Sequence, residues 1–192
     1  MAYLILGLVL FLGIHSVRMF ADGWRTNMVE KLGEGGWKGL YTVVAIVGLV
    51  LVVWGYGQAR LNMVWVWIPP IWTAHLAALL TVPAFILLAA AYVPGTHMKA
   101  KLGHPMVLSV KVWALAHLLA NGTLADIVLF GSFLVWAIVN FAKSRRRDRA
   151  EGVVRTAVGA SRDAIAVVIG LVAWVAFAFY LHAVLIGVRP FG

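Results

Sequence analysis

The chain has 192 residues, of which 63% are hydrophobic and 12% are charged, and its mean hydropathy is +0.94. A soluble domain carries about twice that charged fraction, and several apolar stretches here approach or exceed the roughly 18 residues that indicate a membrane-spanning helix. A soluble globular protein is therefore excluded. The absence of cysteine excludes disulfides, thiolate ligands and thiol nucleophiles.

Six apolar stretches predict six membrane-spanning helices in a single domain, residues 1–192. Their expected bounds are Tyr3–Phe20, Trp37–Gly57, Ile71–Tyr92, Pro105–Ala120, Leu124–Ala142 and Ala164–Val188. The first stretch has no positive residue ahead of it and no cleavage pattern after it, so we expect it to remain as a helix. The fourth is short and carries Lys111, and an NGT turn joins it to the fifth as an antiparallel hairpin. The predicted fold is an all-α, polytopic helical bundle.

The placement of the positive charges predicts how these helices cross the membrane. The formal net charge is +9, from 16 Lys and Arg against 7 Asp and Glu. One side of the predicted bundle receives Arg18, Arg25, Lys31, Lys38, Lys99, Lys101, Lys111, Lys143, Arg145, Arg146, Arg147, Arg149, Arg155 and Arg162. The other side receives Arg60 and Arg189. Because cytoplasmic loops are rich in Lys and Arg, the first side is expected to be cytoplasmic and both termini non-cytoplasmic.

The segment KSRRRDRAEGVVRTAVGASRD, which begins at Lys143 and includes Arg162, forms a basic cluster. It is typical of a cytoplasmic anchor that fixes topology, and the alternative is that it binds anionic lipid headgroups. Nucleic acid is not expected as a partner, because charge is the only feature that would support it. The tryptophan-rich run MVWVWIPPIW indicates an aromatic belt at the membrane interface.

The histidines are the residues with ligand chemistry in this sequence: His15, His75, His97, His104, His117 and His182. His97 and His104 fall in a cytoplasmic connection, where we expect solvent to satisfy them. The other four fall in helices, where an ionisable group is a functional-site hypothesis by default. Taken alone, each one more often bridges helices through a hydrogen bond worth roughly 1 kcal/mol.

Depth in the membrane allows His15 and His117 to meet as a pair. His15 precedes Arg18 by one turn, and Arg18 is expected to reach the cytoplasmic interface. His117 follows Lys111 by six residues, a rise of about 9 Å, which allows both histidines to meet in the cytoplasmic half. The nearby NGT turn, however, draws His117 toward the opposite face.

Two neutral imidazoles on facing helices suit a haem iron, which needs an apolar slot, axial ligands and cations near its propionates. Arg18 lies on the same helix face as His15 and is a candidate for a propionate. Asp126 could hold the second ring nitrogen of His117, and its alternative role is that of an acid at a helix start. His75 or His182 could replace one of the pair. Zinc is not supported, because no two histidines are spaced i, i+3 or i, i+4.

Three segments resemble the NnrU family of bacterial membrane proteins over essentially the whole chain: GIHSVRMF, AAAYVPGTHMKAKLGHPMVLSVKVWALAHLLANG and LHAVLIGVRPFG. That family is linked to nitrite and nitric oxide reduction in denitrification. It is similar in turn to 15-cis-zeta-carotene isomerase, a polytopic enzyme that binds haem b through histidines in an HS motif and a WCLAH-like motif. The resemblance implies His15 and His117 as ligands. Ala114 stands where the isomerase-like motif has Cys, so thiolate ligation is not available here.

These observations support three hypotheses for a multi-pass protein of the bacterial inner membrane. The leading one is a haem b protein that serves nitrogen-oxide respiration, with a respiratory protein as partner. The second, implied by the resemblance, is a haem-dependent cis-trans isomerase of an apolar polyene such as zeta-carotene. The third is a cofactor-free membrane scaffold in which His15 and His117 only bridge helices. Bound haem distinguishes the first two from the third.

Overall fold

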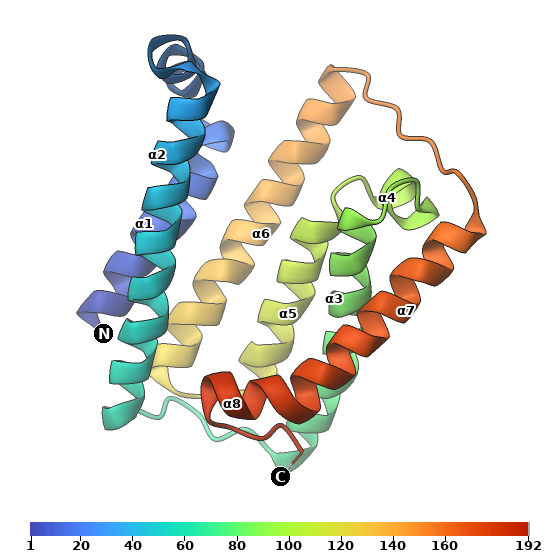
Figure 1. The fold of residues 1–192 in the computed structure, drawn as a ribbon. Coiled ribbons are helices and arrows are strands. Elements are labelled where there is room, and N and C mark those ends of the chain that lie inside the picture. The colour runs from blue at the N-terminus through green and yellow to red at the C-terminus, as the bar shows by residue number, and fades with distance from the viewer. Residues whose placement is uncertain (192) are drawn as a thin grey trace. The chain divides into compact units, whose positions relative to one another are not determined.

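The structure is a computed structural model that describes residues 1–191, and it is built from helices (Figure 1). Five helical stretches are long and apolar enough to cross a membrane. They are α1 (Ala2–Phe20), α2 (Asp22–Ala59), α3 (Ile71–Tyr92), α6 (Leu124–Ala150) and the stretch that begins with α7 (Ala160–Ala176). Residues 1–191 contain no strand beyond one bridge between Trp65 and Thr123. The predicted all-α, polytopic fold is confirmed.

The chain divides into two compact units. The first unit comprises Met1–Trp67 and Gly122–Trp136, so it holds α1, α2 and the first part of α6. The second unit comprises Ile68–Asn121 and the chain from Ala137 onward. It holds α3, α4 (His97–Leu102), α5 (Pro105–Ala120), the rest of α6, α7 and α8 (His182–Ile186). That the whole chain forms one domain stays a prediction.

In the first unit, α1 and α2 run side by side and approach closely at glycines (Figure 1). A Cβ atom added at Gly7 would lie 2.5 Å from the backbone nitrogen of Val52. One added at Gly48 would lie 2.7 Å from the backbone nitrogen of Phe11. Small residues allow this approach, and close packing is what holds membrane helices together because lipid is as apolar as their side chains.

The second helix extends well beyond its apolar stretch. It begins at Asp22 rather than at the predicted Trp37, and Gly33, with φ 72° and ψ 164°, interrupts its early part. After this break Lys38 pairs with Glu34, with 3.0 Å between Nζ and Oε2. Pairs spaced i, i+4 stabilise exposed helices. Hydropathy therefore predicted the apolar part of α2 but not the polar part of the helix before Trp37.

Backbone hydrogen bonds join the segment after α2 to the turn before α6, within the first unit. The Val66 amide donates to the Gly122 carbonyl at 2.9 Å, and the Leu124 amide donates to the Val64 carbonyl at 2.8 Å. A Cβ atom at Gly122 would overlap the Trp67 carbonyl. The NGT turn therefore requires glycine at this position, because the backbone of Trp67 lies too close to admit a side chain.

In the second unit, α3 contacts both α5 and α7. Its buried hydrophobic residues are all alanines: Ala77, Ala84, Ala89 and Ala90. On α7, a Cβ atom at Gly170 would lie 2.6 Å from the Cα atom of Ile86. Small residues thus set the helix spacing here as they do between α1 and α2.

The helix α5 spans Pro105–Ala120, as predicted, and has 16 residues. Its length is about 24 Å at 1.5 Å per residue, less than the roughly 30 Å hydrocarbon core. It is therefore a shorter apolar helix, and five rather than six helices meet the length for crossing. His117 lies in its last turn. His117 therefore lies toward the NGT turn, and the expectation that it lies in the cytoplasmic half of the membrane stays a prediction.

Two predicted helices differ from the structure in the later part of the chain. The helix expected to end at Ala142 continues to Ala150, through the first part of the basic cluster. Lys and Arg are good helix formers, so the end of an apolar stretch need not end the helix. The single helix expected over Ala164–Val188 consists of α7, a π-helical segment Phe177–Leu181 and α8.

The two histidines of the connection after α3 bind carboxylates. His97 donates from Nδ1 to Oδ2 of Asp163 at 2.7 Å, and His104 donates from Nε2 to Oδ2 of Asp148 at 2.9 Å. Arg155 also donates to Asp148, at 2.6 Å, and the side chain of Asp148 is only 12% exposed. The expectation that solvent satisfies these histidines is wrong, because the acids that bind them come from distant parts of the chain.

The close approach of α1 and α2 predicts that Gly48→Ala destabilises the protein by about 1–3 kcal/mol, because the helices must separate to admit the methyl group. Thermal unfolding of the detergent-purified protein measures this loss. Gly57→Ala is the control in the same helix, since a Cβ atom there meets nothing within 4 Å. Equal melting temperatures for both variants would contradict the packing described.

Candidate functional site

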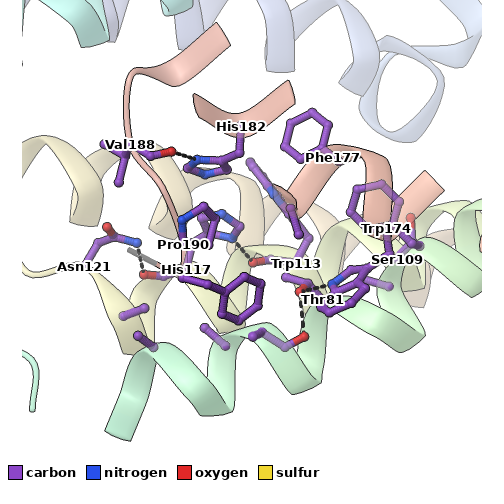
Figure 2. A pocket seen from close by; sticks show the side chains of 18 of the residues that line it. Thr81, Ser109, Trp113, His117, Asn121, Trp174, Phe177, His182, Val188 and Pro190 are labelled. Carbon is purple, nitrogen blue, oxygen red and sulfur yellow. Dashed lines mark hydrogen bonds between the residues drawn. The ribbon is translucent and has the colours of Figure 1, made fainter. Parts of the chain in front are cut away.

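A cavity of about 460 Å³ lies within the second unit (Figure 2). Residues of α3, α5, α7, α8 and the segment after α8 line it, and most of them are alanines or aromatic residues. The ionisable side chains among these residues are those of His117, His182 and Arg189. Small-molecule sites typically have volumes of about 300–1,000 Å³, an apolar lining and a few polar groups. The cavity has these properties.

The helix α5 positions His117 from its last turn. The ring donates from Nδ1 to the backbone carbonyl of Trp113, one turn earlier, at 2.9 Å. The side chain of Asn121 donates to the His117 carbonyl at 2.8 Å, which satisfies a backbone group at the helix end. His117 is half-buried and belongs to the cavity wall.

His182 is the first residue of α8 and lines the same cavity (Figure 2). Its Nδ1 donates to the backbone carbonyl of Val188 at 2.7 Å. The chain can fold back to make this bond because Gly187 adopts a left-handed conformation, with φ 77°. The ring of Phe177 meets His182 edge-on, with ring centres 5.9 Å apart.

Hydrogen bonding indicates which nitrogen of each ring carries a proton. A carbonyl oxygen only accepts, so Nδ1 must carry the proton in both His117 and His182. In a neutral imidazole the lone pair then lies on Nε2. Metal-bound histidines commonly have this arrangement, with the other nitrogen held by a carbonyl or carboxylate.

The hydroxyl groups of the cavity are engaged with protein partners. Thr81 accepts from Nε1 of Trp174 at 2.9 Å and donates to the carbonyl of Ala78 at 2.8 Å. Ser109 donates to the carbonyl of Met106 at 2.7 Å. These groups fix the wall of the cavity, while the imidazoles give it ligand-binding chemistry.

His15 lies on α1 in the first unit, among aromatic rings. Its Nδ1 donates to the carbonyl of Phe11 at 2.6 Å. The ring centres of Tyr41 and Trp136 lie 5.2 Å and 6.2 Å from that of His15. Arg18, one turn later on the same helix, is exposed. The ring of His15 is thus held in the same way as that of His117.

The structure places the predicted site residues in different units. His15 and Arg18 belong to the first unit and His117 to the second, so the pairing of His15 with His117 stays a prediction. Within the second unit, His117 shares its cavity with His182. His75 is exposed on α3 and does not belong to the cavity wall.

Asp126 is a buried acid at the start of α6. Its Oδ2 accepts from the amide of Thr123 at 3.0 Å and from the Thr123 hydroxyl at 2.6 Å, and its own amide donates back to that hydroxyl at 3.3 Å. This reciprocal pattern is a capping box. The Tyr56 hydroxyl donates to Oδ1 at 2.5 Å. Both carboxylate oxygens are therefore engaged within the first unit, which favours the helix-start role over an interaction with His117.

Comparison with known proteins places the chain in a family. The sequence model described as NnrU protein matches residues 3–190. The chain belongs to the NnrU family. No curated protein and no solved structure matches the chain. The resemblance seen in the sequence is thus confirmed, and the matched region of this NnrU protein includes His15, His117 and His182.

The remaining titratable side chains of the NnrU chain do not form a larger metal site. Within residues 1–191 no group of three or more His, Cys, Asp or Glu side chains is placed to hold a metal ion.

Sequence reasoning left His182 as an alternative and did not place it beside His117. The sequence pattern does not indicate this pairing, because the two histidines are far apart in the chain. The hydrogen bond that orients His182 also depends on a reversal of the chain at Gly187. The C-terminal run VRPFG contained a hint, since a glycine before it and a proline within it indicate a turn. Arg189 was assigned only to topology, although it lines the cavity.

The contacts of Asp126 predict that Asp126→Asn lowers the free energy of unfolding by about 1–3 kcal/mol, because an amide offers one acceptor oxygen where the carboxylate offers two. Thermal unfolding in detergent measures the loss. Tyr56→Phe, which removes one donor and leaves the carboxylate, is expected to cost less. An unchanged melting temperature for Asp126→Asn would show that the capping box does not support the fold.

Proposed function

We propose that this NnrU protein binds haem b through membrane-embedded histidines and serves nitrogen-oxide respiration, linked to nitrite and nitric oxide reduction. The observation that carries the proposal is the position of His117 on the wall of an apolar cavity, with Nδ1 held by the Trp113 carbonyl. Metal-bound histidines are commonly held in this way, with one ring nitrogen on a backbone carbonyl.

The residues present fit a haem in three respects. The cavity is apolar and lined by aromatic rings, which suits a planar macrocycle. His117 would supply an imidazole, the kind of ligand that haem iron takes in many proteins. Arg189 lines the cavity and can pair with a propionate. Arg18 has the same proposed role for a haem bound by His15.

The second iron ligand is a further intramembrane histidine, for which the sequence predicts His15. The ring of His15 is half-buried and its Nδ1 is held by a carbonyl, as in His117. When bound, the haem supplies a redox-active iron. The chain itself holds one nitrogen of each ring and excludes water through its apolar side chains.

We infer that the protein resides in a bacterial inner membrane with its basic residues on the cytoplasmic side. In the first unit, Arg18, Arg25 and Lys31 lie at the end of the α1–α2 pair opposite to Arg60. In the second unit the basic cluster lies at the end that holds α4. Part of it continues α6 as a helix, so its exposed side chains, such as Arg146 and Arg149, are presented to anionic lipid headgroups.

Haem binding predicts a low-spin b-type absorption spectrum for protein purified in detergent with haem supplied during expression. In His117→Ala the spectrum is expected to be lost or to convert to high spin, because the iron loses an axial nitrogen. His15→Ala tests the ligand predicted from the sequence in the same way. Absorption of the oxidised and dithionite-reduced forms is the measurement.

His75→Ala is the matched control for these variants, because His75 also donates from Nδ1 to a carbonyl one turn earlier but is exposed. Its spectrum is expected to equal that of the wild type. Purified wild-type protein that stays colourless after haem is supplied would contradict the proposed function and favour a cofactor-free scaffold.

The inferred orientation predicts which introduced cysteines react from outside. The natural chain has no cysteine, so labelling has no background. A membrane-impermeant maleimide is expected to label Asn62→Cys in intact spheroplasts, and Glu151→Cys only after the membrane is permeabilised. Both positions are exposed in the structure. Labelling of Glu151→Cys in intact spheroplasts would reverse the topology.

A further inference from the structure

The cavity that holds His117 contains a second imidazole whose Nδ1 is also held by a backbone carbonyl. We propose that this residue, His182, is the second histidine that binds the haem iron, and that the segment Gly187–Phe191 positions its ring. The inference rests on haem binding as the function and places His182 where the sequence predicts His15.

The depth of each histidine supports this assignment. The start of α5 lies at the basic end of the second unit, where His104 binds Asp148, and His117 lies in the last turn of α5 at the other end. Likewise α7 begins at the basic end, where Asp163 binds His97, and His182 follows the far end of α7. The positive-inside rule therefore puts both residues in the non-cytoplasmic half. It puts His15, one turn from Arg18, in the cytoplasmic half of its own unit.

The hydrogen bond of His182 differs from those of the other helical histidines. His15, His75 and His117 each use the carbonyl four residues earlier in their own helix. His182 instead uses Val188, which follows α8. Its ring orientation is therefore set by a separate segment of chain, in the way that outer-shell partners orient metal-bound histidines.

A π-helical turn precedes His182 directly. The His182 amide donates to the carbonyl of Phe177, five residues earlier, and the two rings meet edge-on. Both residues line the cavity. A π turn widens the helix by one residue and often occurs at functional sites. Here the π turn places His182 and Phe177 on the same side of the helix, facing the cavity. The irregular backbone thus helps to orient the imidazole toward the cavity.

The segment after α8 is itself anchored to the cavity wall. The ring of Phe191 stacks on Phe179, with ring centres 5.1 Å apart, and meets Trp174 edge-on at 6.1 Å. Trp174 is in turn hydrogen-bonded to Thr81 on α3. The Val188 carbonyl thus belongs to a segment that is held at Gly187 by the left-handed turn and at Phe191 by aromatic packing.

The test compares the haem-loaded, full-length wild type with His182→Gly, His15→Gly and His117→Gly by absorption spectroscopy in detergent. His182→Gly is expected to convert the low-spin spectrum to a five-coordinate, high-spin one, and added imidazole is expected to restore the low-spin form. His15→Gly is expected to keep the wild-type spectrum. Thermal unfolding of each haem-free variant shows that it is folded.

The outcomes separate this inference from the proposed function. A low-spin spectrum retained by His182→Gly and lost by His15→Gly would overturn the role of His182 while haem binding stands. A wild type that binds no haem would overturn the proposed function, and with it this assignment. Conversion in His182→Gly with rescue by imidazole supports both.

Two matched variants test whether the C-terminal segment Gly187–Phe191 orients the ring of His182. Gly187→Ala places a side chain at φ 77°, and Gly152→Ala places one at φ 63° in the loop before α7, outside the cavity wall. Both strain the backbone in the same way. A mixture of high- and low-spin haem is expected for Gly187→Ala alone. Identical spectra for the two variants would show that the turn does not orient His182.

Discussion

An imidazole inside a lipid bilayer has no water to take its N–H proton, so it must donate to another part of the protein. Each histidine in the apolar helices of residues 1–191 meets this constraint in the same way, with Nδ1 2.6–3.3 Å from a backbone carbonyl. Because a carbonyl only accepts, Nδ1 carries a proton in each ring. In His117 and His182 this occurs at a cavity, so the same kind of bond orients two rings on its wall.

Small side chains leave space for that cavity. The cavity wall on α3 includes Ala74, Ala77, Ala78 and Ala84. Alanine allows α3 to approach its neighbours where it packs against them, and it leaves volume where no neighbour follows. The irregular chain around His182 does not fill this volume, because the π turn and the fold-back at Gly187 direct it around the rim. Helix packing and ligand space therefore depend on the same residue type.

Polar interactions gather at the end of the second unit that carries the basic cluster. Asp148 binds His104 and Arg155, and Asp163 accepts from the amides of His97 and Met98 as well as from the ring of His97. These bonds connect the ends of α4, α5, α6 and α7 outside the apolar stretches. They tie the helix ends together on the basic side of the second unit.

The sequence by itself determined the membrane class, the apolar part of every helix and the family, because lipid requires long apolar runs whatever the tertiary contacts are. It predicted α5 residue for residue, since Pro105 and the turn at Asn121 mark its ends. It did not show that α2 begins at Asp22 or that α6 reaches Ala150, because polar helical turns have no hydropathy signal. Only the tertiary structure decided which histidines share a cavity. That choice depends on the π turn and the left-handed Gly187, local backbone geometries that bring distant residues together and leave no periodic pattern in the sequence.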